Sequence, residues 1–484
     1  MPSTKKNLPG YKKPVLPLPG KSRGCQLAKS CPVECSVAES VYPSKQATAS
    51  LALTRPHSTT SPVLVRILYR MMKLAVVLLM GLAGVVRPQC VSNNDTLPLP
   101  PKPDLAHITP FAIDLFKELN PAGTTGNFFF SPYSVWNALL LAYFGSAART
   151  RQQLEQVLRL NDKADTLATY RALNRLYRER GANTSDYVID LANRVYVDQQ
   201  FPLRPCVRDV LQEVETIDFG KAEEAAARIN QLVNQTTRGK IPELVTPSVV
   251  SGVPMVLVNA AYFKGLWSNQ FNVSKTVPEK FFFSPDKHTF VPMMKLLSSF
   301  KVGESKELGA SVLEMPYKGE AASMFVLLPH TPDSTTGVDN TTTTPLDAML
   351  GRLTSDTLRA AFAGLEKHEV DLQMPKFKLD QEITDELINA LQRQGIKDLF
   401  TSAANLTTYD PSGQLRVSRG IHKAVVEVNE EGSEAAAATG IIVTFSLPPK
   451  PKKFTLNRPF VFLIHDNHTN NILFIGIYRK PQTD

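Results

Sequence analysis

After residue 103, apolar residues recur at helical spacing in the earlier part of the chain, and they alternate or run continuously in the later part. Residues 134–160 predict two helices separated near Gly145, and residues 166–178, 222–233 and 381–394 predict one helix each. Strands are predicted at 187–197, 253–263, 281–283, 311–328, 368–378 and 422–428, and a late hairpin is predicted to join 460–465 to 472–478. This order, helices mostly before strands and no βαβ repeat, favours an α+β fold.

The first 89 residues differ in pattern from the rest of the chain. Residues 1–60 are rich in Pro, Ser, Thr and Lys and have little apolar periodicity, which is typical of disorder. The basic stretch 70–73 is followed by thirteen uncharged residues, 74–86, which is typical of a signal peptide and shorter than the ~20 residues of a membrane span. We therefore expect four parts: 1–70 disordered or non-native extension, 71–89 signal peptide, 90–103 short proline-rich lead-in and 104–484 a single folded domain.

A signal peptide normally begins a chain, whereas this one begins about 70 residues in. We therefore expect translation to start at Met71 or Met72, with a long leader as the alternative. Asn-x-Ser/Thr glycosylation acceptors are more frequent after residue 89 than the roughly three that chance would give, which also favours a secreted, extracellular glycoprotein. The acceptors are Asn94, Asn183, Asn234, Asn272, Asn340, Asn405 and Asn467.

The formal charge of +9 is confined to the N-terminal part. Residues 1–89 hold 13 basic and two acidic side chains, whereas the remainder holds 41 and 43. The rest of the chain therefore has no overall charge that would favour nucleic acid, and we expect no nucleic-acid or membrane partner. It has only two cysteines, Cys90 and Cys206, so a disulfide scaffold is excluded, and the three earlier cysteines lack the spacing of a metal site.

No enzymatic motif is present after residue 89: GxSxG, HExxH, Walker A and GxGxxG are all missing. The eight histidines of the chain are scattered, and we nominate no catalytic residue, metal ligand or cofactor. A hydrolase that uses scattered Ser, His and Asp side chains is the alternative, which an activity screen would test.

The most unusual stretch begins at Glu430 and continues to Gly440. From Gly432 onward its residues are nearly all small, and the β-forming residues 441–445 and a proline-rich stretch follow. If the stretch became a strand, one face would be uncharged and would carry Ser433, Ala435, Ala437, Thr439, Ile441 and Val443. Such a segment could be buried on one side without steric clashes.

Four separated motifs resemble the serpin family. They are Glu430–Thr439, which resembles the proximal hinge of inhibitory members, and the stretches NFFFSPYS at 127–134, NAAYFKGLW at 259–267 and FTLNRPF at 454–460. The resemblance covers about residues 104–482. It implies a serpin fold of about nine helices and three β-sheets with an exposed reactive-centre loop, and a monomer that is not an enzyme.

The resemblance also implies a mechanism, irreversible inhibition of a serine protease. The protease cleaves the loop, and the loop inserts into the central sheet while the protease is still bound as a covalent acyl-enzyme. The hinge would comprise Glu430, Glu431, Gly432, Ser433, Glu434, Ala435, Ala436, Ala437, Ala438 and Thr439. The shutter beneath the opening sheet would comprise Ser131, Ser134, Asn259 and His422, and the breach where the loop enters would hold Trp267 together with Glu430.

The predicted position of the scissile bond depends on the residue from which the loop is counted. Counting forward from Glu430 gives Ser446, and counting back from Phe454 gives Phe445. We place the bond at Phe445–Ser446, which suits a chymotrypsin-like protease. Cleavage after Ser446 would suit an elastase-like enzyme. Cleavage after Lys450 would suit a trypsin-like enzyme, but a proline follows this lysine, so a trypsin-like target is the third choice.

Two further hypotheses follow from the resemblance. Arg171, Arg175 and Arg178 lie on one helical face and resemble the heparin-binding helix of some serpins, so a glycosaminoglycan is a candidate partner; a charged stripe is also typical of a solvated face. The alternative function is that of a non-inhibitory carrier, chaperone or storage serpin. In such a protein we would expect bulky or charged residues on the inserting face of the hinge.

Overall fold

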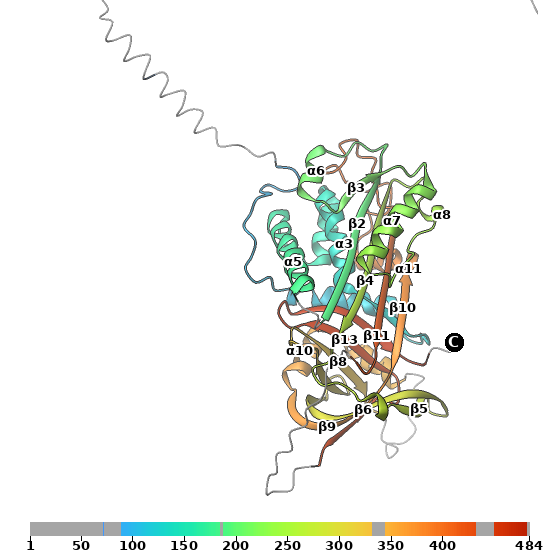
Figure 1. Ribbon diagram of the computed structural model, residues 1–484. Helices are drawn as coiled ribbons and strands as arrows, with labels where there is room; N and C mark the ends of the chain where they lie inside the picture. Colours follow the sequence, from blue (N-terminus) through green and yellow to red (C-terminus); the bar gives the residue numbers. More distant parts are fainter. Residues whose placement is uncertain (1–70, 72–88, 184–186, 332–343, 432–449, 482–484) are drawn as a thin grey trace, which may run out of the picture. The chain divides into compact units, whose positions relative to one another are not determined.

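The computed structural model describes residue 71 and residues 89–183, 187–331, 344–431 and 450–481 (Figure 1). The chain divides into the units Met1–Gly84 and Val85–Asp484, and every element below belongs to the second unit. The expected extension and nearly all of the expected signal peptide therefore lie outside the described residues. So does most of the hinge and loop, from 432 to 449. Among the described residues, no helix has the length and apolarity needed to cross a bilayer.

Ten α-helices and two short 3-10 helices lie in the described ranges, where the resemblance implies about nine helices. They are η1 (Ala106–Ile108), α2 (Thr109–Leu119), α3 (Pro132–Gly145), α4 (Ala148–Leu158), α5 (Lys163–Asn183), α6 (Pro205–Val210), α7 (Ala222–Thr236), α8 (Pro247–Val250), η2 (Val273–Lys275), α9 (Pro345–Arg352), α10 (Ser355–Ala363) and α11 (Asp385–Gln394). All 14 residues of α3 are buried. A helix that is buried all round must have neighbours on every side, and α3 packs on β2 (Tyr187–Asp198), β4 (Met255–Gly265) and β14 (Asn471–Tyr478).

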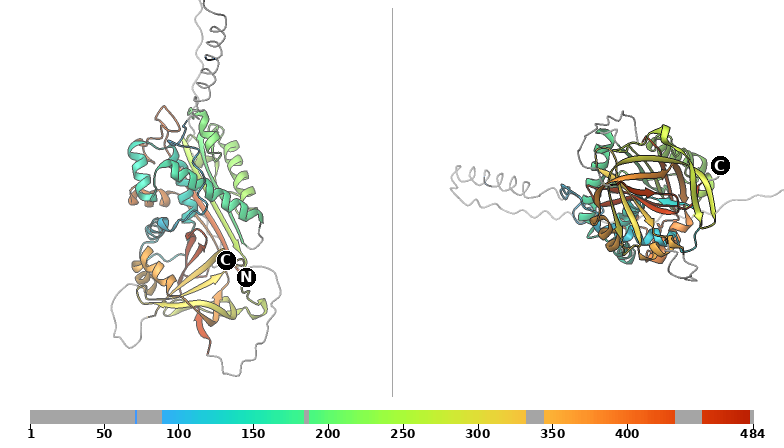
Figure 2. Two further views of the ribbon diagram at one scale, coloured as in Figure 1. Left: turned by 90° about the vertical axis from the view of Figure 1, so that its left-hand side faces the viewer. Right: turned by 90° about the horizontal axis from the view of Figure 1, so that it is seen from below.

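The five-stranded sheet has the order β10-β11-β4-β2-β3. Its other strands are β3 (Val214–Ile217), β10 (Phe377–Ile383) and β11 (Arg419–Val428). Successive residues of β4 alternate between two apolar clusters: Leu257, Ala261 and Phe263 face the cluster that contains α3, whereas Val258, Ala260 and Tyr262 face the cluster that contains α7. Helices therefore cover both faces of this sheet (Figures 1 and 2). Burial on both faces explains why 253–263 is continuously apolar.

The nine-stranded sheet has the order β1-β14-β13-β8-β7-β6-β9-β12, with β5 paired to β6. Its strands are β1 (Phe128–Phe130), β5 (Val277–Ser284), β6 (Lys287–Ser305), β7 (Ala310–Pro316), β8 (Ala322–Pro329), β9 (Glu366–Pro375), β12 (Lys452–Thr455), β13 (Phe460–Asp466) and β14. The edge strand β12 pairs with β9 in parallel through four residue pairs, from Lys452–Val370 to Thr455–Gln373.

The described strands form two sheets, not the three that the resemblance implies. The reason is the length of β6, which has 19 residues. Its first part pairs with β5, its middle with β9 and its last five residues with β7. One long strand therefore joins two groups of strands into one hydrogen-bonded path.

Several predicted elements have different bounds in the structure. The predicted strand 368–378 is divided at Lys376 between β9 and β10, and the predicted strand 281–283 is the end of the longer β5. Residues 381–383, which were expected to be helical, continue β10, because Leu379 and Ile383 keep a strand-like alternation of buried positions. The helix α11 begins only after Thr384. The predicted strand 311–328 is two strands, β7 and β8, joined by a turn in which Gly319 has a φ of 76°.

Candidate functional site

The candidate site is built around the boundary between the adjacent strands β4 and β11, which we call the seam. These two central strands are parallel and pair from Arg419–Val256 to Val426–Phe263. Parallel neighbours end at the same edge of a sheet, so the residues that follow β11 come out beside the residues that follow β4. This places Asn429 and Glu430 next to the segment that contains Trp267.

The four predicted shutter residues, Ser131, Ser134, Asn259 and His422, meet in one buried cluster beneath this seam. Ser131 is the N-cap of α3: its side chain accepts a hydrogen bond from the Ser134 backbone N–H at 3.1 Å and donates to the Leu473 carbonyl at 2.6 Å. The Asn259 Nδ2 donates to the Ser134 carbonyl at 2.6 Å and to the Ser134 Oγ at 2.7 Å. The cluster therefore connects the start of α3 to β4 and β14.

His422 of β11 closes the cluster. Its Nε2 accepts a hydrogen bond from the Ser131 backbone N–H at 3.1 Å, so the ring proton is on Nδ1, which donates to the Asn259 Oδ1. The ring is completely buried, and this burial lowers the pKa of His422 to about 3. The imidazole is therefore neutral at physiological pH. Both of its nitrogens are engaged within the fold, so it is not a general base.

Two buried asparagines belong to the same network and were missed from the sequence. Asn193 of β2 lies directly opposite Asn259 in the sheet, and its Oδ1 accepts hydrogen bonds from the Ser134 Oγ at 2.9 Å and the Asn259 Nδ2 at 2.5 Å. Its own Nδ2 donates to the Asn137 Oδ1 at 2.9 Å. Asn193 could have been identified from the sequence, because an asparagine within a predicted strand that is largely apolar needs buried hydrogen-bond partners.

The predicted breach residue Trp267 lies at the end of the seam. Its ring stacks on Tyr317 with a centroid separation of 4.6 Å, and its Nε1 donates to the Asn429 carbonyl at 2.9 Å. Nearby, the Phe271 backbone N–H donates to the Glu430 carbonyl at 3.2 Å. The two residues that follow β11 are therefore held by their backbone to the segment that follows β4.

The side chain of Glu430 is also held, by Lys376. The Lys376 Nζ donates to the Glu430 Oε2 at 2.9 Å, and the carboxylate is buried whereas the lysine is half exposed. Burial alone would raise the pKa of Glu430, but hydrogen bonds to the carboxylate, of which that from Lys376 has the largest effect, together with the charge of Lys376 outweigh it and lower the pKa below its usual value. This partner was not predicted, and it lies in the short link between β9 and β10.

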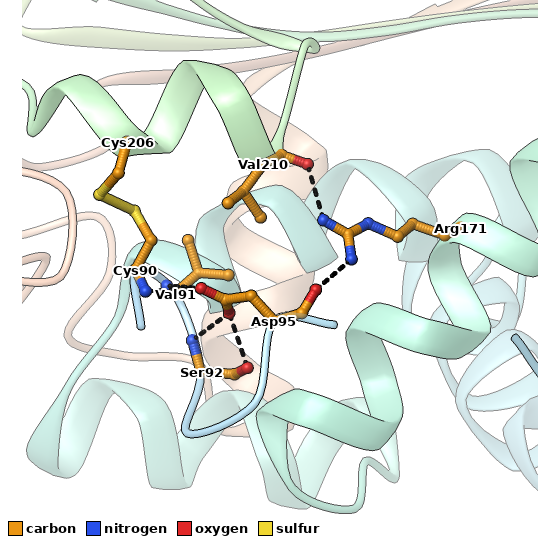
Figure 3. The surroundings of a disulfide bond; sticks show 7 residues. All are labelled: Cys90, Val91, Ser92, Asp95, Arg171, Cys206 and Val210. Carbon is orange, nitrogen blue, oxygen red and sulfur yellow. Dashed lines mark hydrogen bonds between the residues drawn. A yellow bond between two sulfur atoms is a disulfide. The ribbon is translucent and has the colours of Figure 1, made fainter. Parts of the chain in front are cut away.

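The three arginines proposed for glycosaminoglycan binding lie on α5 and have different surroundings. Arg171 is partly buried and donates from Nη1 to the Asp95 carbonyl at 2.5 Å and from Nη2 to the Val210 carbonyl at 3.4 Å (Figure 3). Arg175 is exposed and pairs with Glu179 at 2.7 Å, and Arg178 is exposed. Arg171 therefore fastens the N-terminal segment to α5, and only Arg175 and Arg178 present an exposed guanidinium.

The same N-terminal segment is tied to α6 by a disulfide between Cys90 and Cys206, whose Cα atoms are 5.9 Å apart (Figure 3). The Asp95 carboxylate accepts from the backbone N–H groups of Cys90 at 2.5 Å and Ser92 at 2.9 Å, which shapes the segment next to the bond. Both cysteines are evident in the sequence, but their pairing was not predicted.

The glycosylation acceptors also differ in their surroundings. The side chains of Asn94, Asn234 and Asn272 are exposed, and Asn405 is partly buried. Asn467 is exposed, but its Nδ2 donates to the Glu320 carbonyl and to the Ser323 Oγ, both at 3.0 Å. Asn340 and the side chain of Asn183 lie outside the described residues, as do Phe445 and Ser446.

Comparisons with known proteins agree with the motifs. A family model described as "Serpin (serine protease inhibitor)" matches residues 106–481. Ipis-1 of Ixodes persulcatus is 38% identical over 388 residues, which cover 77% of this chain and 98% of that protein. Leukocyte elastase inhibitor A of Mus musculus is 38% identical over 382 residues, with coverage of 77% and 98%.

Solved structures give the same result. Uncleaved ovalbumin aligns with a TM-score of 0.67 at 27% identity and covers 78% of this chain and 99% of its own. Maspin aligns with a TM-score of 0.69 at 27% identity, with coverage of 78% and 98%.

Proposed function

Because this chain belongs to the serpin family, we propose that it is a secreted suicide-substrate inhibitor that traps serine proteases by inserting its cleaved reactive-centre loop between β4 and β11. The observation that carries the proposal is the parallel seam between these strands. A segment that leaves the end of β11 and turns back runs antiparallel to β11, and therefore also to β4. Such a segment can form a regular hydrogen-bonded ladder with β11 on one side and with β4 on the other.

The energy of such an insertion is large enough to act on a protease. Insertion replaces one ladder, of eight residue pairs, by two ladders of similar length. At ~1 kcal/mol net for each hydrogen bond, the gain is on the order of 10 kcal/mol, comparable with the stability of a whole domain. We propose that this energy drives the covalently attached protease into a distorted state.

Contacts at one end and in the middle of the seam support this order of events. At one end, Asn429 and Glu430 are already anchored beside Trp267 and Lys376, so the first inserted residues would start from a fixed point. In the middle, the His422–Asn259 hydrogen bond crosses the seam and must break as the strands separate. We propose that these contacts keep the sheet closed until the loop is cut.

We propose Phe445–Ser446 as the scissile bond and a chymotrypsin-like enzyme as the target, because an aromatic residue before a small one suits an apolar specificity pocket. Cleavage after Ser446 by an elastase-like enzyme is the alternative. The relatives named leukocyte elastase inhibitors make elastase a necessary comparison. Secretion is supported by the Cys90–Cys206 disulfide, since such bonds persist in oxidising compartments.

The proposal is tested by incubating the full chain separately with chymotrypsin, leukocyte elastase and trypsin. We expect a complex with chymotrypsin that survives SDS, together with a released peptide that begins at Ser446. A peptide that begins at Leu447 would move the bond by one residue. Clean cleavage without a complex, and without a rise in thermal stability, would contradict inhibition and favour a carrier, chaperone or storage role.

A further inference from the structure

Exposed large apolar side chains are concentrated in one part of the described residues. Apart from Met71 and Leu99, all of them lie between residues 273 and 297, on η2, β5 and β6: Val273, Val277, Phe282, Phe283, Phe290 and Leu297. Single exposed apolar residues are ordinary, whereas exposed apolar residues that adjoin one another are typical of an interaction surface.

Two of these six exposed residues, Phe282 and Phe290, lie on one face of the hairpin formed by β5 and β6. Directly opposed residues in this antiparallel pair share a face, and the pairs Phe282–His288, Lys280–Phe290 and Pro278–Pro292 alternate along it. We call these six residues the outer aromatic face. The His288 ring lies 5.4 Å from the Phe282 ring and 6.2 Å from the Phe290 ring, so the three rings form a continuous strip.

The core does not require the outer aromatic face. The opposite side of the same hairpin carries Phe281 and Val291, which are 0% and 2% exposed. Phe290 is 62% and Phe282 is 36% exposed. Polar side chains at these two positions would therefore leave the buried side of the hairpin unchanged.

The outer aromatic face lies between the two points where the reactive-centre loop is attached. On one side, the backbone N–H of Lys376 donates to the Pro292 carbonyl at 2.9 Å, and the Lys376 side chain holds Glu430, where the loop begins. On the other side, the Phe282 backbone N–H donates to the Asn457 carbonyl at 2.7 Å, two residues after the end of β12, where the loop returns. The outer aromatic face is thus hydrogen-bonded to both loop attachments.

We propose that the outer aromatic face is a docking surface for the body of the target protease, outside its active-site cleft. This inference rests on the proposed function for the identity of the partner. A protease and its protein inhibitor bury about 800 Å² on each partner, and surface beside the loop attachments is the nearest part of the inhibitor that can contribute to this area. The exposed Lys280 and His288 among the aromatic rings favour a partner whose rim is apolar and acidic.

Aromatic anchors of this kind carry a large share of interface energy. We therefore expect the double substitution Phe282→Ser and Phe290→Ser to weaken binding of the target protease about tenfold or more. The matched control is Leu99→Ser, which removes an exposed leucine in the segment before α2. Phe290→Ser alone is a second variant with less risk to folding, and thermal unfolding checks each protein.

The experiment measures two quantities on the full chain: the Kd for chymotrypsin and leukocyte elastase whose active-site serine is replaced by alanine, and complex formation with the active enzymes. We expect both Phe variants to raise the Kd, the control to leave it unchanged and every variant to form the complex. A complex with an unchanged Kd in both Phe variants would overturn the docking surface and leave the proposed function intact.

The remaining outcomes separate the two proposals. No complex with any variant, but a Kd raised only by the Phe substitutions, would overturn the proposed inhibition and support the docking surface. No complex and no change in Kd would overturn both. A wild-type dimer in solution that Phe290→Ser dissociates, with an unchanged Kd for protease, would overturn the proposal and assign the face to a second copy of this chain.

Discussion

His422 of β11 and Asn259 of β4 lie directly opposite each other in the parallel pair and are joined by a hydrogen bond between their side chains. The seam that the proposed mechanism must open is therefore closed by a side-chain bond as well as by the backbone ladder. Because this bond uses the proton on the His422 Nδ1 and leaves the Nε2 as an acceptor, it requires the neutral ring.

The first prediction concerns this ring and pH. Burial lowers the pKa of His422 to about 3, whereas an unfolded histidine has a pKa of about 6.5. Between these values the unfolded chain binds the extra proton, so the contribution of His422 is complete above pH 6.5 and is lost as the pH falls towards 3. We expect the free energy of unfolding to fall by up to about 1.4 kcal/mol per pH unit from this group. Urea unfolding between pH 7.5 and 5 measures it.

The control for His422 is another histidine. His422→Gln should flatten this part of the pH dependence, whereas His468→Gln, at an exposed position, should leave it unchanged. An equal pH slope in wild type and His422→Gln would show that the ring titrates normally in the folded protein.

The second prediction concerns the anchor of the loop. Lys376→Ala leaves the buried Glu430 carboxylate without its charged donor, and we expect a loss of about 1–3 kcal/mol in the free energy of unfolding. Lys301→Ala removes an ion pair of 2.9 Å to Glu314 from a lysine that is 59% exposed, so its cost should stay within about 1 kcal/mol. Urea unfolding at pH 7 compares them, and equal losses would argue against a special role for Glu430.

The third prediction concerns the Cys90–Cys206 disulfide, which closes a loop with a sequence separation of 116 residues. Removing a native disulfide typically costs about 2–5 kcal/mol, and longer loops lie towards the upper end. We therefore expect a reducing agent to lower the Tm of the wild-type protein. The Cys90→Ser, Cys206→Ser double variant should show a low Tm that the same agent does not change. If the reducing agent leaves the wild-type Tm unaltered, the bond is absent or without effect on stability.

The fourth prediction concerns glycosylation. A glycan at Asn467 would displace the two hydrogen bonds of its Nδ2, whereas Asn94 and Asn272 are exposed and use only their Oδ1 in local turns. We expect glycans at Asn94 and Asn272 and none at Asn467, read by mass spectrometry of peptides before and after glycosidase treatment. A secreted protein without any glycan would contradict the prediction.

The elements with a strong apolar period could be predicted from the sequence. The break near Gly145 separates α3 from α4, and the seam strands β4 and β11 lie within two residues of 253–263 and within three of 422–428. One boundary that was wrong is that at 381–383, where the polar residues Gln381 and Glu382 fit either a helix or the exposed side of a strand. Only the pairing of β10 with β11 decides between them.

The residues of the site that belong to recognisable motifs could be predicted from the sequence. Ser131, Ser134, Asn259 and His422 belong to recognisable motifs or strands, and the structure brings them together. Lys376 and the disulfide were missed because they depend on contacts between segments distant in the chain. No local pattern encodes such a distance.

The four-pair edge strand β12 has a consequence for the lifetime of the uncut protein. The residues between the described segments leave β11 of the five-stranded sheet and return just before β12 of the other sheet, so the insertion that we propose requires the far end of this loop to be released. Under this proposal, proteolysis would release the far end at once, and the other route would be for β12 to separate from β9. The time for which an uncut molecule keeps its activity on storage would then be set by fraying at this short outer strand.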